Sequence, residues 1–214
     1  MESALYKDAP TGLKVIETFG YDPKEGGVRR FQAHMERAQR TCDALGFKFD
    51  RGAAFAKINQ QCYLEPLRIR LLISKSGRVE VETESFKTNA RVWMVKVSPT
   101  RLRFDDPWLQ VKTTNREVYN KERASMPDGV DELIYFNEQD ELCEGTITNI
   151  FVPQSGKLIT PPTDSGLLPG VFREELVRQG VAVPGILHLS DLKAAKAFYL
   201  GNSLRGLIRA KLIE

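Results

Sequence analysis

The stretch Lys112-Thr113-Thr114-Asn115-Arg116 (KTTNR) decides how this sequence is interpreted, because it places a lysine at the end of a hydrophobic segment. After one expected hairpin, residues 144–149 (EGTITN) begin with a glutamate that follows two apolar residues. Residues 167–173 (LLPGVFR) then place a proline–glycine pair directly before an expected helix. An amine, a carboxylate and a helix start able to bind an anion therefore follow one another along the chain.

The composition is that of an ordinary soluble globular protein. The 214 residues, 42% of them hydrophobic and 28% charged, suffice for one large domain or two small ones. The 31 basic and 28 acidic residues leave a net charge of +3, and the basic residues form no long run. This balance gives no support for binding to nucleic acid or to a membrane, so we expect neither partner.

The termini and the cysteines indicate a cytoplasmic protein. The N-terminus has no apolar core of a signal peptide, and no apolar run approaches the length of a membrane span. The odd count of three cysteines, Cys42, Cys62 and Cys143, argues against a disulfide framework. The two histidines, His34 and His188, form no metal-ligand spacing with them, so we expect no metal site.

Apolar periodicity predicts two helices and a small antiparallel sheet in the first half. Residues 33–45 have helical spacing and are followed by Gly46, a typical C-terminal cap, and residues 52–63 are a second helix candidate. Residues 67–73 alternate apolar side chains with arginine, which predicts a strand with one wet face. Further strands are expected over residues 13–19, 78–83 and 92–97. Residues 98–107 are the expected linker, which makes 1–97 the N-terminal domain and 98–214 the C-terminal domain.

The second half is richer in strands. Residues 133–137 and 147–152 are predicted to flank a hairpin turn at 138–140, and residues 158–159 are a short strand. A helix is expected over residues 171–180. The last two apolar segments, 194–200 and 204–212, are separated by Gly201-Asn202-Ser203.

Each candidate group has an ordinary alternative. A Schiff base needs an amine near a carbonyl, which Lys112 could supply, but most lysines are solvated. Glu144 could protonate a ring nitrogen, or it could be a hairpin glutamate on the solvent face. Asn149 could tie loops together or cap a strand end. The amides of Val171 and Phe172 after Gly170 could bind phosphate, or they could belong to a routine helix start.

The predicted first helix carries a further pair. Arg37 lies one turn after His34 and could bind a phosphate bidentately, although a lone helical arginine is usually solvated. We interpret His34 as a structural, hydrogen-bonded residue.

The order of these motifs resembles the class IV aminotransferase family, the fold-type IV pyridoxal phosphate (PLP) enzymes. The resemblance covers nearly the whole chain. It rests on residues 16–18, 33–37 (a helical H-x-x-R pattern), 68–72, 112–116 with Tyr119, 144–149, 167–173 and 202–206.

The resemblance implies a role for each position. Lys112 would form the Schiff base with PLP and move the proton at the substrate carbon, and Glu144 would pair with the pyridine nitrogen. The cofactor-binding set would comprise Arg37, Lys112, Tyr119, Glu144, Thr148, Asn149, Val171, Phe172 and Ser203. Many relatives have a threonine where this chain has Phe172, so only the backbone amide can serve there. Arg116 is the candidate for the substrate carboxylate.

Within the family, residues 111–119, 160–173 and 201–207 look most like 4-amino-4-deoxychorismate lyase, especially the lyase half of fused synthase–lyase chains. The usual opening strands are missing before Ile16, a shortened start that those lyase halves share. The resemblance thus implies conversion of 4-amino-4-deoxychorismate to 4-aminobenzoate and pyruvate, within folate biosynthesis. A transaminase acting on a small branched-chain or D-amino acid, and a PLP-binding protein without turnover, are the alternatives.

The expected architecture follows the family. It is an α+β fold with a small α/β sandwich domain and a strand-rich pseudo-barrel domain, with the cofactor in the cleft between them. A small-molecule substrate and a homodimer are the partners that the resemblance implies.

Overall fold

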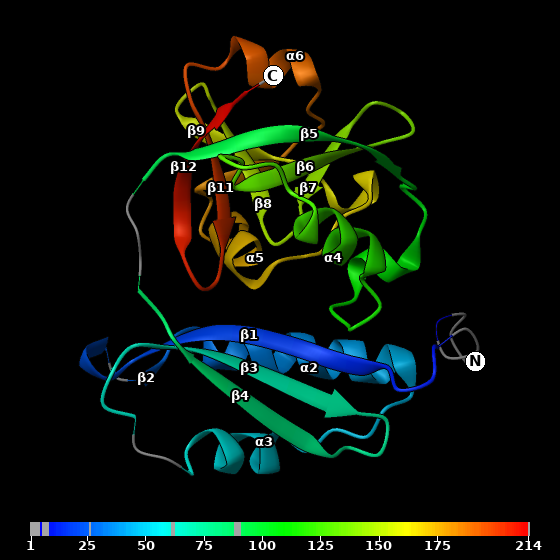
Figure 1. The fold of residues 1–214 in the computed structure, drawn as a ribbon, viewed down its shortest axis with the longest axis vertical. Coiled ribbons are helices and arrows are strands. Elements are labelled where there is room, and N and C mark those ends of the chain that lie inside the picture. The colour runs from blue at the N-terminus through cyan, green and yellow to red at the C-terminus, as the bar shows by residue number, and fades with distance from the viewer. Residues whose placement is uncertain (1–4, 6–8, 26, 61–62, 88–90, 214) are drawn as a thin grey trace. The chain divides into compact units, whose positions relative to one another are not determined.

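Two sheets of different size organise the chain in the computed structural model, which describes residue 5 and residues 9–25, 27–60, 63–87 and 91–213 (Figure 1). The chain divides into two units. The first unit contains Met1–Thr88 and Val111–Asn115, and the second contains Asn89–Gln110 and Arg116–Glu214.

The first unit holds a four-stranded antiparallel sheet of order β2-β1-β3-β4. Its strands are β1 (Lys14–Asp22), β2 (Gly27–Val28), β3 (Leu67–Ser74) and β4 (Val79–Ser85). One face is wet, as the alternating sequence predicts, because Arg68 and Arg70 on β3 lie opposite acidic residues of β4. Their ion pairs with Glu84 and Glu82 measure 3.0 and 3.3 Å.

Two helices pack on this sheet, α2 (Phe31–Leu45) on β1 and α3 (Arg51–Ile58) on β4, and a short η1 (Pro23–Glu25) precedes β2. The positions with helical spacing on α2, among them Met35, Cys42 and Leu45, are at most 1% exposed. Gly46 ends α2 with φ of 64°, a left-handed conformation that suits glycine. The second predicted helix is shorter than expected, and residues 61–62 lie outside the described part of the chain.

The second unit holds an eight-stranded sheet of order β10-β9-β8-β11-β12-β5-β6-β7. Three neighbouring pairs are parallel, namely β10 with β9, β12 with β5, and β5 with β6. The strands are β5 (Trp93–Leu102), β6 (Glu132–Asn137), β7 (Leu142–Gly145), β8 (Asn149–Gln154), β9 (Lys157–Thr160), β10 (Ala182–Pro184), β11 (Phe198–Asn202) and β12 (Gly206–Leu212).

This sheet curls into a half-barrel, because β8 packs against β7 as well as pairing with β9 and β11. Helix α4 contacts β6, and helix α5 contacts β10 and β11. The helical segments are η2 (Pro107–Gln110), α4 (Glu117–Ala124), η3 (Thr163–Ser165), α5 (Val171–Arg178) and α6 (Leu189–Ala194). The predicted α+β class with a small sandwich and a strand-rich half-barrel is thereby confirmed.

The predicted linker at residues 98–107 is wrong in its first half. Strand β5 continues to Leu102 and pairs with β6 and β12, so it crosses the predicted boundary between residues 97 and 98 and belongs to the second unit. Pro99 lies within β5 although proline has no N–H group to donate to a neighbouring strand. The pairing of β5 with β6 shifts register between Val97 and Arg101, and such an irregularity accommodates a proline within a strand.

The predicted hairpin after residue 137 has the right turn but a different second strand. Asp140 N–H donates to the Asn137 carbonyl at 3.1 Å, and Asp140 has a positive φ of 59°. The returning strand is β7 rather than residues 147–152, and β8 begins only at Asn149. The sequence LCEG of β7 has little strand propensity, yet all four of its residues are buried.

Among the described residues, no helix has the length and apolar character needed to cross a membrane. Cys42 and Cys143 are buried free thiols, and Cys62 lies outside the described residues.

Gly201 on β11 is a position where the core leaves no room for a side chain. A Cβ there would lie 2.8 Å from the Phe151 ring and 3.1 Å from the Phe172 ring. We predict that Gly201→Ala lowers the free energy of unfolding by about 1–3 kcal/mol through overpacking. Denaturant unfolding checks this. Gly52→Ala in the first turn of α3 is the control, since the closest atom there is the Asp50 carboxylate at 3.2 Å. Equal effects would contradict the packing argument.

Candidate active site

Lys112 is held by its backbone along the edge of β1 in the first unit. Its carbonyl accepts from Ile16 N–H at 2.9 Å, and Thr114 N–H donates to the Lys14 carbonyl at 2.9 Å. Thr113 forms an isolated bridge with Val15. The lysine therefore belongs to a short extended segment, half-buried, whose position is set by β1.

A buried charge cluster lies on the neighbouring residues of β1. Glu17 shares the face of Val15, opposite Leu71, and is fully buried. Its Oε1 accepts from Arg37 Nε at 2.9 Å, and its Oε2 accepts from Arg37 Nη2 at 2.6 Å. His34 Nδ1 lies 2.6 Å from the same Oε2. Arg37 and His34 are 4% and 1% exposed, so α2 delivers both side chains to the carboxylate.

The cluster fixes the charges of its members. Burial opposes ionisation of Glu17, but the Arg37 charge and the His34 hydrogen bond outweigh it and lower the pKa of Glu17 to about 2. Burial lowers the pKa of His34, and the charges of Arg37 and Lys112 act in the same direction. Lys112 is therefore close enough for its charge to affect the pKa of His34. The structural interpretation of His34 is confirmed, and Arg37 is engaged in a bidentate ion pair rather than solvated.

In the second unit, Glu144 lies near the end of β7 with 7% exposure. Tyr119 Oη donates to Oε1 at 2.8 Å, and Leu168 N–H donates to Oε2 at 3.1 Å. Burial and the Glu144 charge raise the pKa of Tyr119, so the phenol stays protonated and donates. Glu144 is therefore a buried carboxylate with a defined orientation, and the solvent-exposed alternative is wrong. Tyr119, which the resemblance places among the cofactor-binding residues, donates to Glu144 here.

Asn149, the first residue of β8, holds the same backbone segment as Glu144. Its Nδ2 donates to the Leu168 carbonyl at 3.0 Å. The peptide groups on both sides of Leu168 are therefore fixed by Glu144 and Asn149. Asn149 ties two segments together, which is one of the two roles that the sequence allows.

The segment after Leu168 leads into helix α5. Gly170 is its N-cap and, as a glycine, has no side chain with which to cap the helix. The first intrahelical bond runs from Glu174 N–H to the Gly170 carbonyl at 2.8 Å, which leaves the amides of the first turn as the positive end of the helix dipole. A Cβ on residue 170 would lie 2.0 Å from Asn149 Oδ1, so only glycine permits this approach.

Phe172 points its side chain into the core. Its ring packs edge-on against Phe151 at 6.2 Å and lies over Gly201, with Leu176 in the same cluster. Because the ring is used for packing, the side chain of Phe172 cannot hold a ligand, so such a role would fall to its backbone amide, as the resemblance implies. Val171 is likewise buried.

The remaining predicted residues differ in their surroundings. The Thr148 hydroxyl donates to the buried Glu132 at 3.0 Å, so its hydrogen is used in a bond within the protein. Ser203 is 7% exposed in the turn between β11 and β12. Arg116 donates to the Thr146 carbonyl and, at 3.3 Å, to Asn120.

Sequence reasoning missed two buried carboxylates, Glu17 and Glu132, both 0% exposed. A signal existed for Glu17, because it occupies the core-facing position between Val15 and Phe19 in an alternating strand. Glu132 opens the apolar run of β6 and looks like an ordinary strand start.

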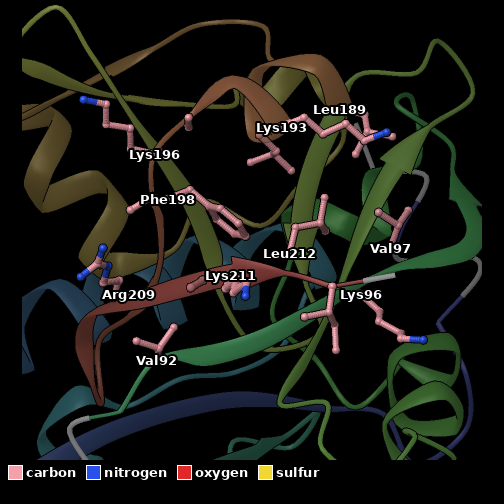
Figure 2. A pocket seen from close by; sticks show the side chains of 15 residues that line it. Val92, Lys96, Val97, Leu189, Lys193, Lys196, Phe198, Arg209, Lys211 and Leu212 are labelled. Atoms are coloured by element: carbon pink, nitrogen blue, oxygen red, sulfur yellow. The ribbon is translucent and has the colours of Figure 1, made fainter.

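A cavity of about 1000 Å³ in the second unit involves none of the predicted site residues. Figure 2 shows Lys196 and Arg209 on one side of it and Lys96 on the other. The described residues that line it include no Asp, Glu, His or Cys. Its charged lining consists of lysines and an arginine with no carboxylate, so the amine and buried carboxylate that the sequence predicts lie elsewhere, at Lys112 and Glu144.

Comparison with known proteins identifies the family. A family model described as amino-transferase class IV matches residues 14–213. The crystal structure of a provisionally named amino-acid aminotransferase from Mesorhizobium loti is 36% identical, with a TM-score of 0.90, over 94% of this chain and 100% of that one. A provisionally named aminodeoxychorismate lyase of Schizosaccharomyces pombe is 27% identical over 93% of this chain and 89% of its own length. A provisionally named branched-chain aminotransferase of Thermotoga maritima is 30% identical over 85% and 71%.

The chain belongs to the class IV aminotransferase family and is a PLP-dependent enzyme. Its own residues fit that cofactor. Lys112 offers an amine, Glu144 a buried carboxylate, and Gly170 a helix start whose first-turn amides form the positive end of the helix dipole.

The Glu17–Arg37 pair predicts acid sensitivity. Because the pKa of Glu17 is about 2 in the folded state and 4.5 in the reference state, the unfolded chain binds more protons between these values. The stabilisation, about 3 kcal/mol, is present above pH 4.5 and is lost as the pH falls toward about 2. Glu17→Gln should therefore flatten the pH dependence of unfolding in this window.

At neutral pH, Glu17→Gln should cost about 3–5 kcal/mol, because Arg37 stays buried without its counter-charge. Denaturant unfolding at a series of pH values measures both effects. Glu84→Gln, a side chain that is 66% exposed, is the control and should change stability by less than about 1 kcal/mol. An unchanged pH profile in Glu17→Gln would contradict the assignment.

Proposed function

We propose that this enzyme is a PLP-dependent lyase that converts 4-amino-4-deoxychorismate to 4-aminobenzoate and pyruvate. The observation that carries PLP chemistry is the buried Glu144 carboxylate, oriented by Tyr119 and Leu168 in the same unit as the helix start at Gly170. The choice of a lyase is supported by the likeness to the fission yeast lyase over 93% of this chain.

PLP, when bound, supplies a carbonyl that condenses with amines and a ring that holds the electron pair released when a C–H bond breaks. In the proposal, Lys112 Nζ would be the amine that holds the PLP carbonyl, and the substrate amine would replace it there. The freed Nζ then accepts the proton from the substrate carbon that bears the amine.

Glu144 would keep a proton on the pyridine nitrogen of the bound cofactor. Two hydrogen bonds from Tyr119 and Leu168 fix the carboxylate, so little reorganisation is needed when it faces a cation. The amides of Val171 and Phe172, with the Ser203 hydroxyl and Arg37, are proposed to hold the phosphate. Loss of the ring proton and departure of the enolpyruvyl group make the substrate ring aromatic, which drives the reaction.

An aminotransferase is the second candidate, because the Mesorhizobium loti structure is 36% identical over all of its length. It would use the same Lys112 and return the proton to a cofactor carbon rather than let a group leave. A homodimer is proposed from the family resemblance, and a cytoplasmic location from the odd number of cysteines.

The role of Lys112 predicts a spectroscopic loss. The wild type reconstituted with PLP should show a visible absorbance band, and Lys112→Ala should lose it, with kcat lowered about 1000-fold or more. Lys121→Ala, which replaces an exposed lysine of α4, is the control and should keep both. Absence of the band in the wild type would contradict PLP binding, and its retention in Lys112→Ala would contradict the assignment of the lysine.

The reaction itself is decided by the products. The lyase should release pyruvate from 4-amino-4-deoxychorismate with no added keto acid, measured by coupling to lactate dehydrogenase. An aminotransferase should instead convert the visible band to that of the amine form on addition of an amino acid alone. Amine-form conversion without pyruvate release would overturn the lyase in favour of the second candidate.

A further inference from the structure

A tight turn separates the two residues that hold Leu168. Residues 145–148 connect β7 to β8, and Gly145 N–H donates to the Thr148 carbonyl at 2.8 Å. Glu144 lies directly before this turn and Asn149 directly after it. Any shift of the turn therefore moves the carboxylate and the amide together.

Glu132 supports this turn from the protein interior. Its Oε1 accepts from Thr146 N–H at 3.1 Å and from the Thr146 hydroxyl. Its Oε2 accepts from Ile147 N–H at 3.3 Å and from the Thr148 hydroxyl at 3.0 Å. Four donors of one short turn thus converge on a single carboxylate that is 0% exposed.

The close approach depends on Gly145. A Cβ at that position would lie 3.0 Å from both Cγ and Cδ of Glu132 and 2.5 Å from the Thr148 hydroxyl. Residue 145 therefore has to be glycine for the carboxylate to pass under the turn. Arg123 closes the cluster, with Nη1 3.3 Å from Glu132 Oε1 and 2.8 Å from the Thr146 hydroxyl.

The carbonyls of the turn are held as well. Arg116 donates to the Thr146 carbonyl, and Asn202 Nδ2 donates to the Ile147 carbonyl at 3.2 Å. Because these donors and acceptors of the turn are engaged, its position depends on the group that accepts from most of the donors. That group is Glu132.

We propose that Glu132 is a positioning residue, which sets the placement of Glu144 and Asn149 by fixing the turn between them. Through the two hydrogen bonds at Leu168, the same carboxylate also sets the placement of the Gly170 helix start relative to Glu144. This inference rests on the proposed PLP chemistry, because Glu144 and the helix start are the groups that would bind the cofactor.

Glu132→Gln tests the inference with little change in shape. A carboxamide presents one acceptor and one donor, so its NH₂ group faces turn donors and cannot accept from them. The apparent Kd for PLP, from absorbance titration, should rise about tenfold, and kcat should fall about 10–100-fold, as displacement of a binding group predicts. Thr148→Val removes only one donor and should show the same changes more weakly, which protects the test against failure of Glu132→Gln to fold.

A double-mutant cycle separates positioning from general stability. If Glu132 acts through Glu144, then Glu132→Gln should lower kcat less than about threefold once Glu144→Gln is present. Full additivity would overturn the inference. Glu122→Gln is the matched control, since Glu122 also accepts from buried hydroxyls, at Ser98 and Tyr135, and neither of these residues belongs to the turn. It should leave kcat within about threefold of the wild type.

Hydrogen–deuterium exchange on the cofactor-free protein gives a readout independent of activity. Glu132→Gln should accelerate exchange in peptides covering residues 144–149 and 167–170, while Glu122→Gln should not. Unchanged exchange at both peptides would overturn the inference even if PLP binds. A wild type that binds no PLP would overturn the proposed function, and the exchange pattern would still decide whether Glu132 holds the turn.

Discussion

Burying a carboxylate among apolar residues is the constraint on which much of this structure depends. An unpaired buried charge is very costly, so each such carboxylate must be met by donors from several segments. The Glu17 carboxylate is hydrogen-bonded to Arg37 and His34, which both lie on α2. Glu132 collects the donors of the turn after β7. Each carboxylate therefore acts as an organising point, because the segments that satisfy it cannot move separately.

The same constraint explains why glycine stands at certain positions. A carboxylate or amide that has to reach a backbone needs space where a side chain would otherwise lie. Gly145 makes space for Glu132, and Gly170 makes space for Asn149. In both places the glycine is required by close approach, since neither residue has a positive φ.

The sequence predicts those parts of the fold whose apolar pattern is long and regular. Helix α2 and strand β3 fall where their periodicity places them. Helix α4 has no buried residue and so leaves no apolar pattern to detect. Strand β7 is short and includes a charged residue and a glycine, although all of it is buried. Tertiary context, not local propensity, decides such segments.

The candidate site divides in the same way. Lys112, Glu144 and Gly170 are identifiable because their residue types and order carry chemistry. The groups that orient Glu144 are harder to identify. Tyr119 is predicted to bind the cofactor, whereas it donates to Glu144, and Leu168 and Glu132 act through hydrogen bonds between segments distant in the sequence. Some of these hydrogen bonds come from backbone groups, as at Leu168. A residue of any type other than proline could donate such a bond, so the residue type does not reveal it.

The two candidate reactions differ only after the first proton has been removed. An aminotransferase has to return that proton and admit a keto acid, whereas a lyase is carried forward by aromatisation of its substrate. The groups that hold the cofactor therefore serve both, and the choice falls to side chains that face the substrate. Arg116 is suited to such a role, because the Thr146 carbonyl, Asn120 and the Tyr119 ring, 5.3 Å away, already hold its guanidinium. A guanidinium held in this way loses little further freedom when a carboxylate binds, so less of the binding free energy is spent on ordering the side chain.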